Sequence, residues 1–305
     1  MGTGRSGCSR SWHQDQLAEM GELYALLAAL SWTTAAYGFR HLGGTLTPLQ
    51  LNLWKGILAC LGLAAFIAVS GQWISLPSAV WLPLLLSGLI GITLGDTLLF
   101  SALNRIGERT TLTIAESAAP LFTIGLGMLW LGEFLTLWQW LGAALILPAL
   151  FWVLEPGNPA HRSHPLLGLS FALGAALCQA LGMVLMRQVF LAVDMPASQG
   201  ALLRLLAGIA ALPVLLSLRR QSWLPRLTLR QWMILALSTL VGTLLAIWFQ
   251  QLAVKRAEAG VVQTLIATCA IMAFAIDRLR GNKASSKAWL GLVVAFTGVA
   301  LIALS

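Results

Sequence analysis

The sequence contains little charge: Asp, Glu, Lys and Arg make up only 10% of its 305 residues, against 58% hydrophobic residues. This scarcity excludes an ordinary soluble protein, whose surface must be largely polar or charged. The apolar residues fall instead into blocks of about 20, the length that a helix needs to cross a hydrocarbon core of ~30 Å. The sequence therefore predicts an all-α membrane protein.

The formal net charge of +8 does not indicate a nucleic-acid-binding protein. Such a protein needs a basic stripe on a soluble face. Here the Lys and Arg residues lie mostly in short connections between apolar blocks, where they interact with lipid headgroups and set orientation. We therefore expect the lipid bilayer, and no nucleic acid, as the partner of this charge.

Cysteine is also scarce, and Cys8, Cys60, Cys178 and Cys269 show no paired spacing. Three of the four lie inside apolar blocks, where a small packing role is favoured over a disulfide or a metal site. The chain also lacks a phosphate-binding loop of the form Gly-x-x-x-x-Gly-Lys-Ser/Thr. We expect no metal, no cofactor, no ATP hydrolysis and no enzymatic activity.

What is present is a series of ten apolar blocks, which predicts ten transmembrane helices. Residues 1–21 are polar and are expected to form a tail without regular structure. Residues 22–154 and 167–305 each contain five spans, and residues 155–166 form a polar linker between them. The predicted spans are Leu23–Phe39, Pro48–Val69, Trp81–Leu103, Thr110–Leu131, Trp138–Leu154, Pro165–Arg187, Pro196–Leu216, Trp232–Val254, Gly260–Leu279 and Ala288–Leu304.

The two halves repeat one pattern, with matched residues 147 to 151 positions apart. Because each half has an odd number of spans, the second must enter the bilayer from the opposite face. Such inverted repeats are typical of transporters whose site lies near the bilayer midplane. The matched pairs include Arg40 with Arg187, Lys55 with Arg204, Arg105 with Arg256, and Gly132 with Gly281.

Four charged residues lie deep inside the predicted spans: Lys55, Asp96, Glu116 and Arg204. Each is about ten residues from the nearest turn, which at 1.5 Å per residue places it ~15 Å deep, near the bilayer centre. A charge at that depth costs at least ~2.5–3.5 kcal/mol on insertion scales, so it should face a partner or a wet cavity. Two cations and two anions are therefore expected at one depth.

Two interpretations of these charges stay open. They could be structural ion pairs that hold the halves together, or a polar site for a zwitterionic solute in which Asp96 or Glu116 also binds a proton. Buried ion pairs stabilise poorly, because desolvation offsets the Coulomb gain. That argument favours a functional role, with a carboxylate coupling transport to protons.

Further candidates for the site are two tryptophans at similar depth, Trp32 and Trp248, with Tyr37 and Gln250 nearer the surfaces. Aromatic faces can hold an apolar or cationic part of a ligand. The alternative for either tryptophan is simple packing against lipid or at the interface.

Three segments of the first half read Glu116-Ser-Ala-Ala-Pro120, Trp130-Leu-Gly-Glu133 and Trp140-Leu-Gly-Ala. They resemble the EamA family of the drug/metabolite transporter superfamily, and the resemblance covers essentially residues 22–305. It implies a carrier in a bacterial-type inner membrane, usually an exporter of amino acids or related metabolites. It also implies cytoplasmic termini, whereas the distribution of Lys and Arg favours an external N-terminus; we follow the family.

The second half departs from the family pattern. Cys269-Ala270 stands where a proline is usual, and Gly281-Asn282 replaces Gly-Glu. The sequence therefore does not predict a proline bend in the ninth span, or a second acidic turn.

These features predict a secondary active exporter of a small-molecule solute, working by alternating access around the central charged site. A channel and a membrane-embedded enzyme are the alternatives. The enzyme would need a surface site, for which His161 and His164 in the linker are the candidates. An assembly of two copies also stays open.

Overall fold

The structure, a computed structural model, describes residues 6–42, 45–106, 108–154, 165–279 and 286–303. Within these ranges the chain is helical, with short connections and no strand, as predicted. The first half contains α1 (Ser6–Leu42), α2 (Pro48–Ser70), α3 (Ser78–Gly88), η1 (Leu89–Leu94), α4 (Gly95–Ile106), α5 (Glu108–Leu126), η2 (Gly127–Leu131) and α6 (Leu137–Leu154). The second half contains α7 (Pro165–Ala192), α8 (Ala197–Ala210), α9 (Leu212–Leu218), α10 (Leu229–Thr239), η4 (Leu240–Leu245), α11 (Ala246–Arg256), α12 (Ala259–Ala267), α13 (Cys269–Leu279) and α14 (Ser286–Ala303).

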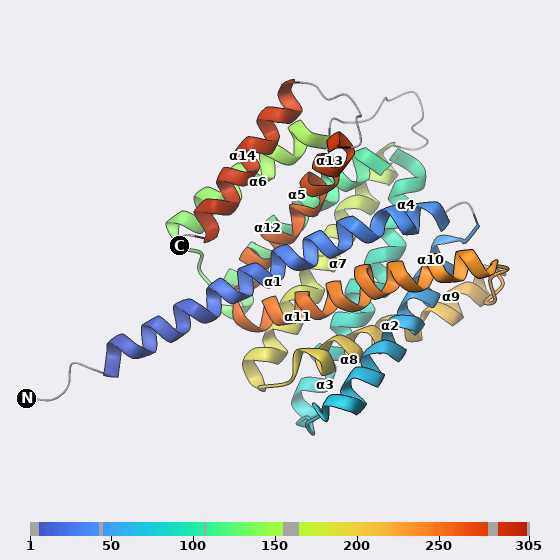
Figure 1. The fold of residues 1–305 in the computed structure, drawn as a ribbon, viewed down its shortest axis with the longest axis horizontal. Helices are drawn as coiled ribbons and strands as arrows, with labels where there is room; N and C mark the ends of the chain where they lie inside the picture. Colours follow the sequence, from blue (N-terminus) through green and yellow to red (C-terminus); the bar gives the residue numbers. More distant parts are fainter. Residues whose placement is uncertain (1–5, 43–44, 107, 155–164, 280–285, 304–305) are drawn as a thin grey trace, which may run out of the picture.

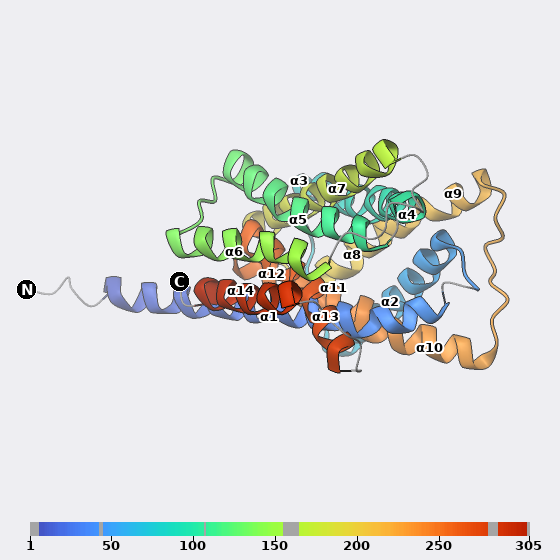
Figure 2. The same ribbon diagram turned by 90° about the horizontal axis from the view of Figure 1, so that it is seen from above.

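Seven helical stretches within the described ranges are long and apolar enough to cross a membrane. Lipid offers no partner for a free backbone N–H or C=O, so the helix is the form in which such segments can cross. Two shorter apolar helices, Leu137–Leu150 and Ser286–Ile302, belong to α6 and α14, which pack side by side (Figures 1 and 2). The seven stretches are Pro48–Ser70, Ser78–Leu103, Ile114–Leu131, Pro165–Ala192, Ala197–Leu218, Leu229–Arg256 and Ala259–Ile276.

The first helix is longer than the sequence pattern predicts. α1 begins at Ser6 and runs without a break to Leu42, so most of the polar stretch that was expected to lack regular structure is helical. Its N-terminal part extends beyond the rest of the molecule (Figure 1). Adding residues to an existing helix costs far less than starting one. The stretch from Gln16 to Glu19 also consists of good helix formers.

Two spans contain a wider, π-helical turn at matched positions. The segment η1 separates α3 from α4, and η4 separates α10 from α11 in the same way. Gly91 in η1 and Gly242 in η4 are 151 residues apart, which is also the spacing between Arg105 and Arg256. π-helical turns inside α-helices are frequent at functional sites. Both halves thus carry the same local irregularity.

The two halves pack crosswise: α4 of the first contacts α7 of the second, and α11 of the second contacts α1 of the first. The Arg105 guanidinium lies 4.7 Å from the ring centre of Phe171, and that of Arg256 lies 5.2 Å from the ring of Tyr24. The repeat relates these two contacts, because Phe171 follows Tyr24 by 147 residues. Each half therefore covers the first helix of the other.

The ninth span breaks although it contains no proline. α12 ends at Ala267 and α13 begins at Cys269, with Thr268 between them. The Thr268 hydroxyl donates to the carbonyl of Leu265, and the Thr33 hydroxyl of α1 donates to the carbonyl of Cys269 at 3.0 Å. Side-chain hydroxyls thus provide hydrogen bonds to backbone carbonyls near the break. Within a membrane such carbonyls have no water to bond, so they need a partner from the protein.

Candidate functional site

A cavity of about 280 Å³ lies among the helices of both halves. Its volume is close to the lower end of the ~300–1,000 Å³ typical of small-molecule sites. Six residues that the sequence singled out line it, namely Trp32, Lys55, Asp96, Glu116, Arg204 and Gln250. The four charged residues that the sequence predicts at one depth thus all line one cavity.

The lining residues follow the repeat. Matched positions of the two halves face the same cavity, so the cavity lies where the repeats meet, as midplane sites of inverted-repeat transporters do. Its chemistry is not symmetric, because apolar Ile247 matches Asp96 and apolar Ile266 lies near the position that matches Glu116. The matched pairs in the lining are Trp32 with Gln179, Lys55 with Arg204, Ile92 with Thr243, Asp96 with Ile247, and Leu99 with Gln250.

Lys55 and Asp96 form an ion pair inside the cavity wall. The Lys55 Nζ atom lies 3.6 Å from Oδ2 of Asp96, and their side chains are 24% and 26% exposed. Asp96 lies in the first turn of α4, directly after η1, so the π-helical turn sets where this carboxylate enters the cavity. This ion pair compensates one cation and one anion among the four central charged residues.

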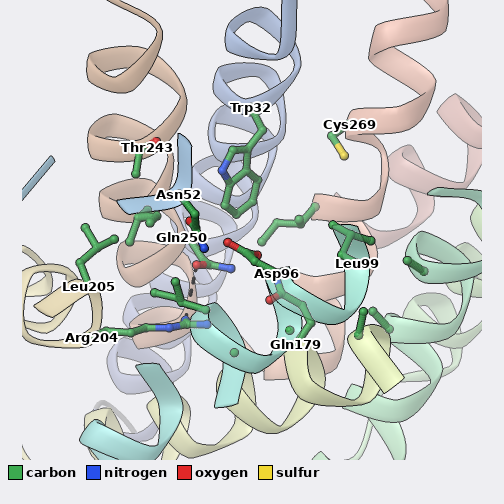
Figure 3. Close-up of a pocket in the computed structure, with 18 of the residues that line it drawn as sticks. Trp32, Asn52, Asp96, Leu99, Gln179, Arg204, Leu205, Thr243, Gln250 and Cys269 are labelled. Atoms are coloured by element: carbon green, nitrogen blue, oxygen red, sulfur yellow. Dashed lines mark hydrogen bonds between the residues drawn. The ribbon is translucent and has the colours of Figure 1, made fainter. Parts of the chain in front are cut away.

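Arg204 of α8 has no such partner. The residue is 3% exposed, its Nε atom makes no hydrogen bond, and Nη1 lies 3.5 Å from Oε1 of Gln250 (Figure 3). Among the described residues no carboxylate lies within ion-pair distance of it. A guanidinium remains charged in a protein, so this buried cation carries a large desolvation cost.

Two glycines make room for the Arg204 side chain. A Cβ atom on Gly91 would lie 3.0 Å from Nη2 of Arg204, and one on Gly182 would lie 3.2 Å from the same atom. The second Cβ would also lie 3.0 Å from the Cα of Gly91. Backbone from η1 and α7 thus holds the guanidinium in place at a close approach that only glycine permits.

Three amide side chains that the sequence interpretation missed also line the cavity: Asn52, Gln179 and Gln263. Asn52 and Gln263 are each 1% exposed, and Asn52 Nδ2, Asn52 Oδ1 and Gln263 Oε1 make no hydrogen bond. In the sequence each of them is a polar residue inside an apolar span, but the sequence argument considered mainly charged residues. Buried polar atoms are normally partnered, so their gathering here indicates a place for a polar ligand.

Trp248 is not part of the cavity lining. Its ring centre lies 5.1 Å from that of Phe66 and stacks on Phe249 at 6.0 Å, so it packs in an aromatic group. Gln250 lines the cavity although it is only two residues further along α11. Neighbouring helix positions are about 100° apart, so residues two positions apart point to nearly opposite sides of the helix. The side chain of Tyr37, and the residues His161 and His164, lie outside the described part of the chain.

A second polar network lies at the turn after η2. Gly132, at φ +68°, adopts the left-handed conformation that favours glycine and ends the helix. The next residue, Glu133, accepts a hydrogen bond from Arg187 Nε and one from the backbone N–H of Ala259 at 2.9 Å. Arg187 also donates to the carbonyl of Val254 at 2.8 Å. This Glu133 network ties the first half to α7, α11 and α12.

A model of the EamA-like transporter family matches residues 19–155 and again residues 166–304. The chain belongs to the EamA-like transporter family. The double match has the spacing of the repeat, and membership makes the chain a multi-pass membrane protein with a general function in membrane transport. It also argues against the enzyme alternative.

Two curated relatives carry transporter names. The chain is 27% identical over 147 residues to "Uncharacterized transporter sll0355" of Synechocystis sp. (strain ATCC 27184 / PCC 6803 / Kazusa), a match that covers 48% of this chain and 44% of the relative. It is 30% identical over 127 residues to "Uncharacterized transporter in cobO 3'region" of Sinorhizobium sp, covering 41% of this chain and 86% of the relative. The chain thus spans less than half the length of the Synechocystis transporter.

The chain shares its fold with a solved crystal structure. The two superpose with a TM-score of 0.77, over 93% of this chain and 96% of the other, at 16% sequence identity. This likeness concerns the fold alone.

Proposed function

We propose that this EamA-like transporter is a secondary active exporter of amino acids or related small metabolites, located in the inner membrane. Its ten transmembrane helices form two inverted five-helix repeats, residues 22–154 and 167–305, which alternate access to the central cavity. The observation that carries the proposal is the cavity itself, in which buried charged and amide side chains from both repeats meet without fully satisfying one another.

The matched π-helical turns support the alternating-access mechanism. η1 and η4 interrupt the third span of each half, and residues of both segments line the cavity. Interrupted helices at corresponding positions of two repeats are the common sign of a transporter binding site. Absence of a phosphate-binding loop from the sequence supports energy supply from a gradient rather than from ATP.

Proton coupling is assigned to the two cavity acids. Asp96 already faces Lys55 at 3.6 Å, whereas Glu116 has no cation within ion-pair distance among the described residues. A carboxylate at the bilayer centre can exchange its charge for a proton, which makes acids there typical of proton relays.

The test is counterflow in proteoliposomes that contain the purified full chain. A panel of amino acids and drugs is offered, with and without a pH gradient. We expect saturable counterflow of a subset of amino acids, accelerated by the gradient. Linear, unsaturable flux would instead indicate a channel, and no flux of any solute would contradict the proposal.

The coupling acids are tested in the same vesicles with Asp96→Asn and Glu116→Gln. At least one of the two variants should lose the pH dependence of transport. If both variants keep the wild-type pH profile, these acids do not couple transport to protons, even when transport itself is present.

A further inference from the structure

We propose that the connection between α9 and α10 is a docking surface for the headgroups of anionic phospholipids. This surface, the arginine strap, comprises residues 219–230 and carries four arginines, Arg219, Arg220, Arg226 and Arg230. None of these residues lines the central cavity. The assignment therefore goes beyond transport and does not depend on the solute that the chain carries.

The strap has a fixed course although most of it lacks regular secondary structure. Gln50 Nε2 donates to the carbonyl of Ser222 at 2.8 Å, and Trp54 Nε1 donates to the carbonyl of Trp223 at 2.9 Å. Both donors belong to α2, so the strap is held against the N-terminal part of that helix. Figure 2 shows the connection running along one edge of the molecule. Its arginines are thus presented by a backbone that is fixed to the first half.

Arg220 adopts an unfavourable backbone conformation. Its φ of +53° is the only positive φ of a non-glycine residue in the described part of the chain. Hydrogen bonds from its N–H to the carbonyl of Ser217, and from the N–H of Gln221 to the carbonyl of Leu216, fix the turn. The Cβ atom of an L-residue disfavours this left-handed conformation, and such outliers cluster at functional sites. An arginine where glycine would be less strained indicates that its side chain is needed there.

The matched connection of the first half, residues 71–77, has the same construction without the charge. Gly71 stands 149 residues before Arg220 and has a φ of +64°. Gln199 Nε2 donates to the carbonyl of Ile74 at 2.8 Å, a bond like the one that holds the strap. Residues 71–77 contain no Asp, Glu, Lys or Arg. The fold therefore forms this connection without arginines, and they are an addition to one copy.

The two connections lie at opposite faces of the membrane. The strap is bonded near the start of α2, and residues 71–77 follow its end. A helix of 23 residues is long enough to cross the hydrocarbon core. The two copies of the connection thus differ in charge between one membrane surface and the other.

The four arginines of the strap have no acidic partner. All four are exposed, and no carboxylate of the described residues lies within ion-pair distance of them. Like charges this close in sequence repel one another unless an anion lies among them. A guanidinium binds a phosphate through two parallel hydrogen bonds. The strap therefore suits phosphate groups.

Exposed apolar side chains lie between and beside these arginines. Leu218, Trp223, Leu224 and Leu229 are between 51% and 79% exposed. Such a mixture at the end of a span is typical of the membrane interface, where tryptophan rings lie at headgroup level. Clusters of about four to eight basic residues beside a transmembrane helix attract anionic lipids. A soluble phosphate would leave the apolar side chains uncovered, so the geometry favours a lipid.

The test measures binding of phosphatidylglycerol and of phosphatidylcholine, with the same acyl chains, to the purified full chain in neutral detergent micelles. Native mass spectrometry gives the dissociation constants. The wild type should bind phosphatidylglycerol at least about tenfold more tightly. Equal binding of the two lipids would overturn the proposal. Glycerophosphoglycerol, the same headgroup without acyl chains, should bind at least about tenfold more weakly than the intact lipid; binding as tight as that of the lipid would indicate a free-phosphate site instead.

Arg220→Gly restores the glycine of the matched connection and is the sharpest variant. It should weaken phosphatidylglycerol binding about fivefold and leave phosphatidylcholine binding unchanged. The unfolding temperature in neutral micelles should stay the same or rise, because the left-handed conformation costs glycine no strain. A lower unfolding temperature with equal weakening of both lipids would show a structural role and would overturn the proposal.

Lys287→Gln is the matched control, since it removes one exposed positive charge outside the strap. It should keep the wild-type preference for phosphatidylglycerol. The variant in which all four strap arginines are replaced by glutamine should lose the preference to within about twofold. If Lys287→Gln weakened phosphatidylglycerol binding as much as Arg220→Gly, net charge alone would explain the binding and the strap would not be a specific surface.

Discussion

Two arginines of the second half, the partly buried Arg187 and the buried Arg204, differ in the partners that surround their charge. Arg187 donates from Nε to Glu133 and from Nη1 to the carbonyl of Val254, and Glu133 is further bound by the N–H of Ala259. Among the described residues, the Arg204 side chain makes one hydrogen bond, at 3.5 Å to the amide of Gln250, and its Nε atom has no partner. Both lie within the hydrophobic protein, so solvent does not explain the difference.

The contrast shows what a structural ion pair looks like in this chain. Where this arginine joins helices, it donates to a carboxylate and to a backbone carbonyl, and the N-terminus of α12 donates to the same carboxylate. Buried guanidinium groups left without such partners are costly, and a site that must bind and release an anion needs that vacancy. The comparison therefore supports a structural role for Arg187 and is consistent with a binding role for Arg204 in the proposed transport cavity.

The largest expected effect is on transport in Arg204→Met. Counterflow should fall by at least about 100-fold, because a buried charge contact of this kind contributes ~3 kcal/mol or more. The thermal unfolding temperature should stay near that of the wild type, since an apolar side chain of similar length replaces an uncompensated charge. Transport within a factor of a few of the wild type would abolish the distinction between the two arginines.

Arg187→Met should mainly lower stability, whereas Arg204→Met should mainly lower transport. The substitution leaves Glu133, only 11% exposed, without its cation, and should lower the free energy of unfolding by about 3 kcal/mol. Denaturant unfolding in detergent measures this. The double variant Glu133→Gln/Arg187→Met is the matched control, and should recover part of the loss because no unpaired charge remains. Equal losses in the single and double variants would mean that the carboxylate left without its cation carries no penalty of its own.

The glycine contacts of Arg204 allow a finer test. Gly182→Ala should destabilise the protein by about 1–3 kcal/mol, because its Cβ would lie 3.0 Å from both the Cα of Gly91 and the carbonyl oxygen of Ser87. Gly125→Ala is the control, since no heavy atom lies within 4 Å of its added Cβ. If Gly182→Ala changed the free energy of unfolding as little as Gly125→Ala, the helices could move apart and the backbone around Arg204 would not be rigid.

The smallest effect concerns the ion pair between Asp194, which lies in the connection between α7 and α8, and Lys255 near the end of α11. The hydrogen bond and the positive charge of Lys255 lower the pKa of Asp194 below its usual value of 3.8. A lowered pKa in the folded state means stability that is present above pH ~4 and is lost as the pH falls through the folded pKa. Because the Asp194 side chain is 92% exposed, screening keeps the effect small.

Asp194→Asn should accordingly lower the unfolding temperature at pH 7 by no more than about 1 °C. The difference from the wild type should vanish in acid well below pH 3.8 and in high salt. A difference that grows on acidification would have the wrong sign and would refute this role of the pair.

Much of the site was predictable because depth in a membrane can be counted along a helix. Ten residues from a turn placed Lys55, Asp96, Glu116 and Arg204 in one plane, and the structure puts all four around one cavity. The same argument failed for Trp248, since depth says nothing of the side of a helix on which a residue lies. Asn52 and Gln263 were missed because an amide has no charge to make its burial conspicuous.

The sequence by itself determined the class, the repeat and the depth of the charges, because apolar length, odd span number and rise per residue are properties of the chain alone. Tertiary structure decided which charges meet. Lys55 pairs with Asp96, and Arg187 with Glu133, across helices that sequence distance does not bring together. It also decided that the backbone at Gly91 and Gly182 closes on Arg204. Ion-pair partners are set by the packing of helix faces, and only the folded molecule shows that no carboxylate of the described residues lies within ion-pair distance of Arg204.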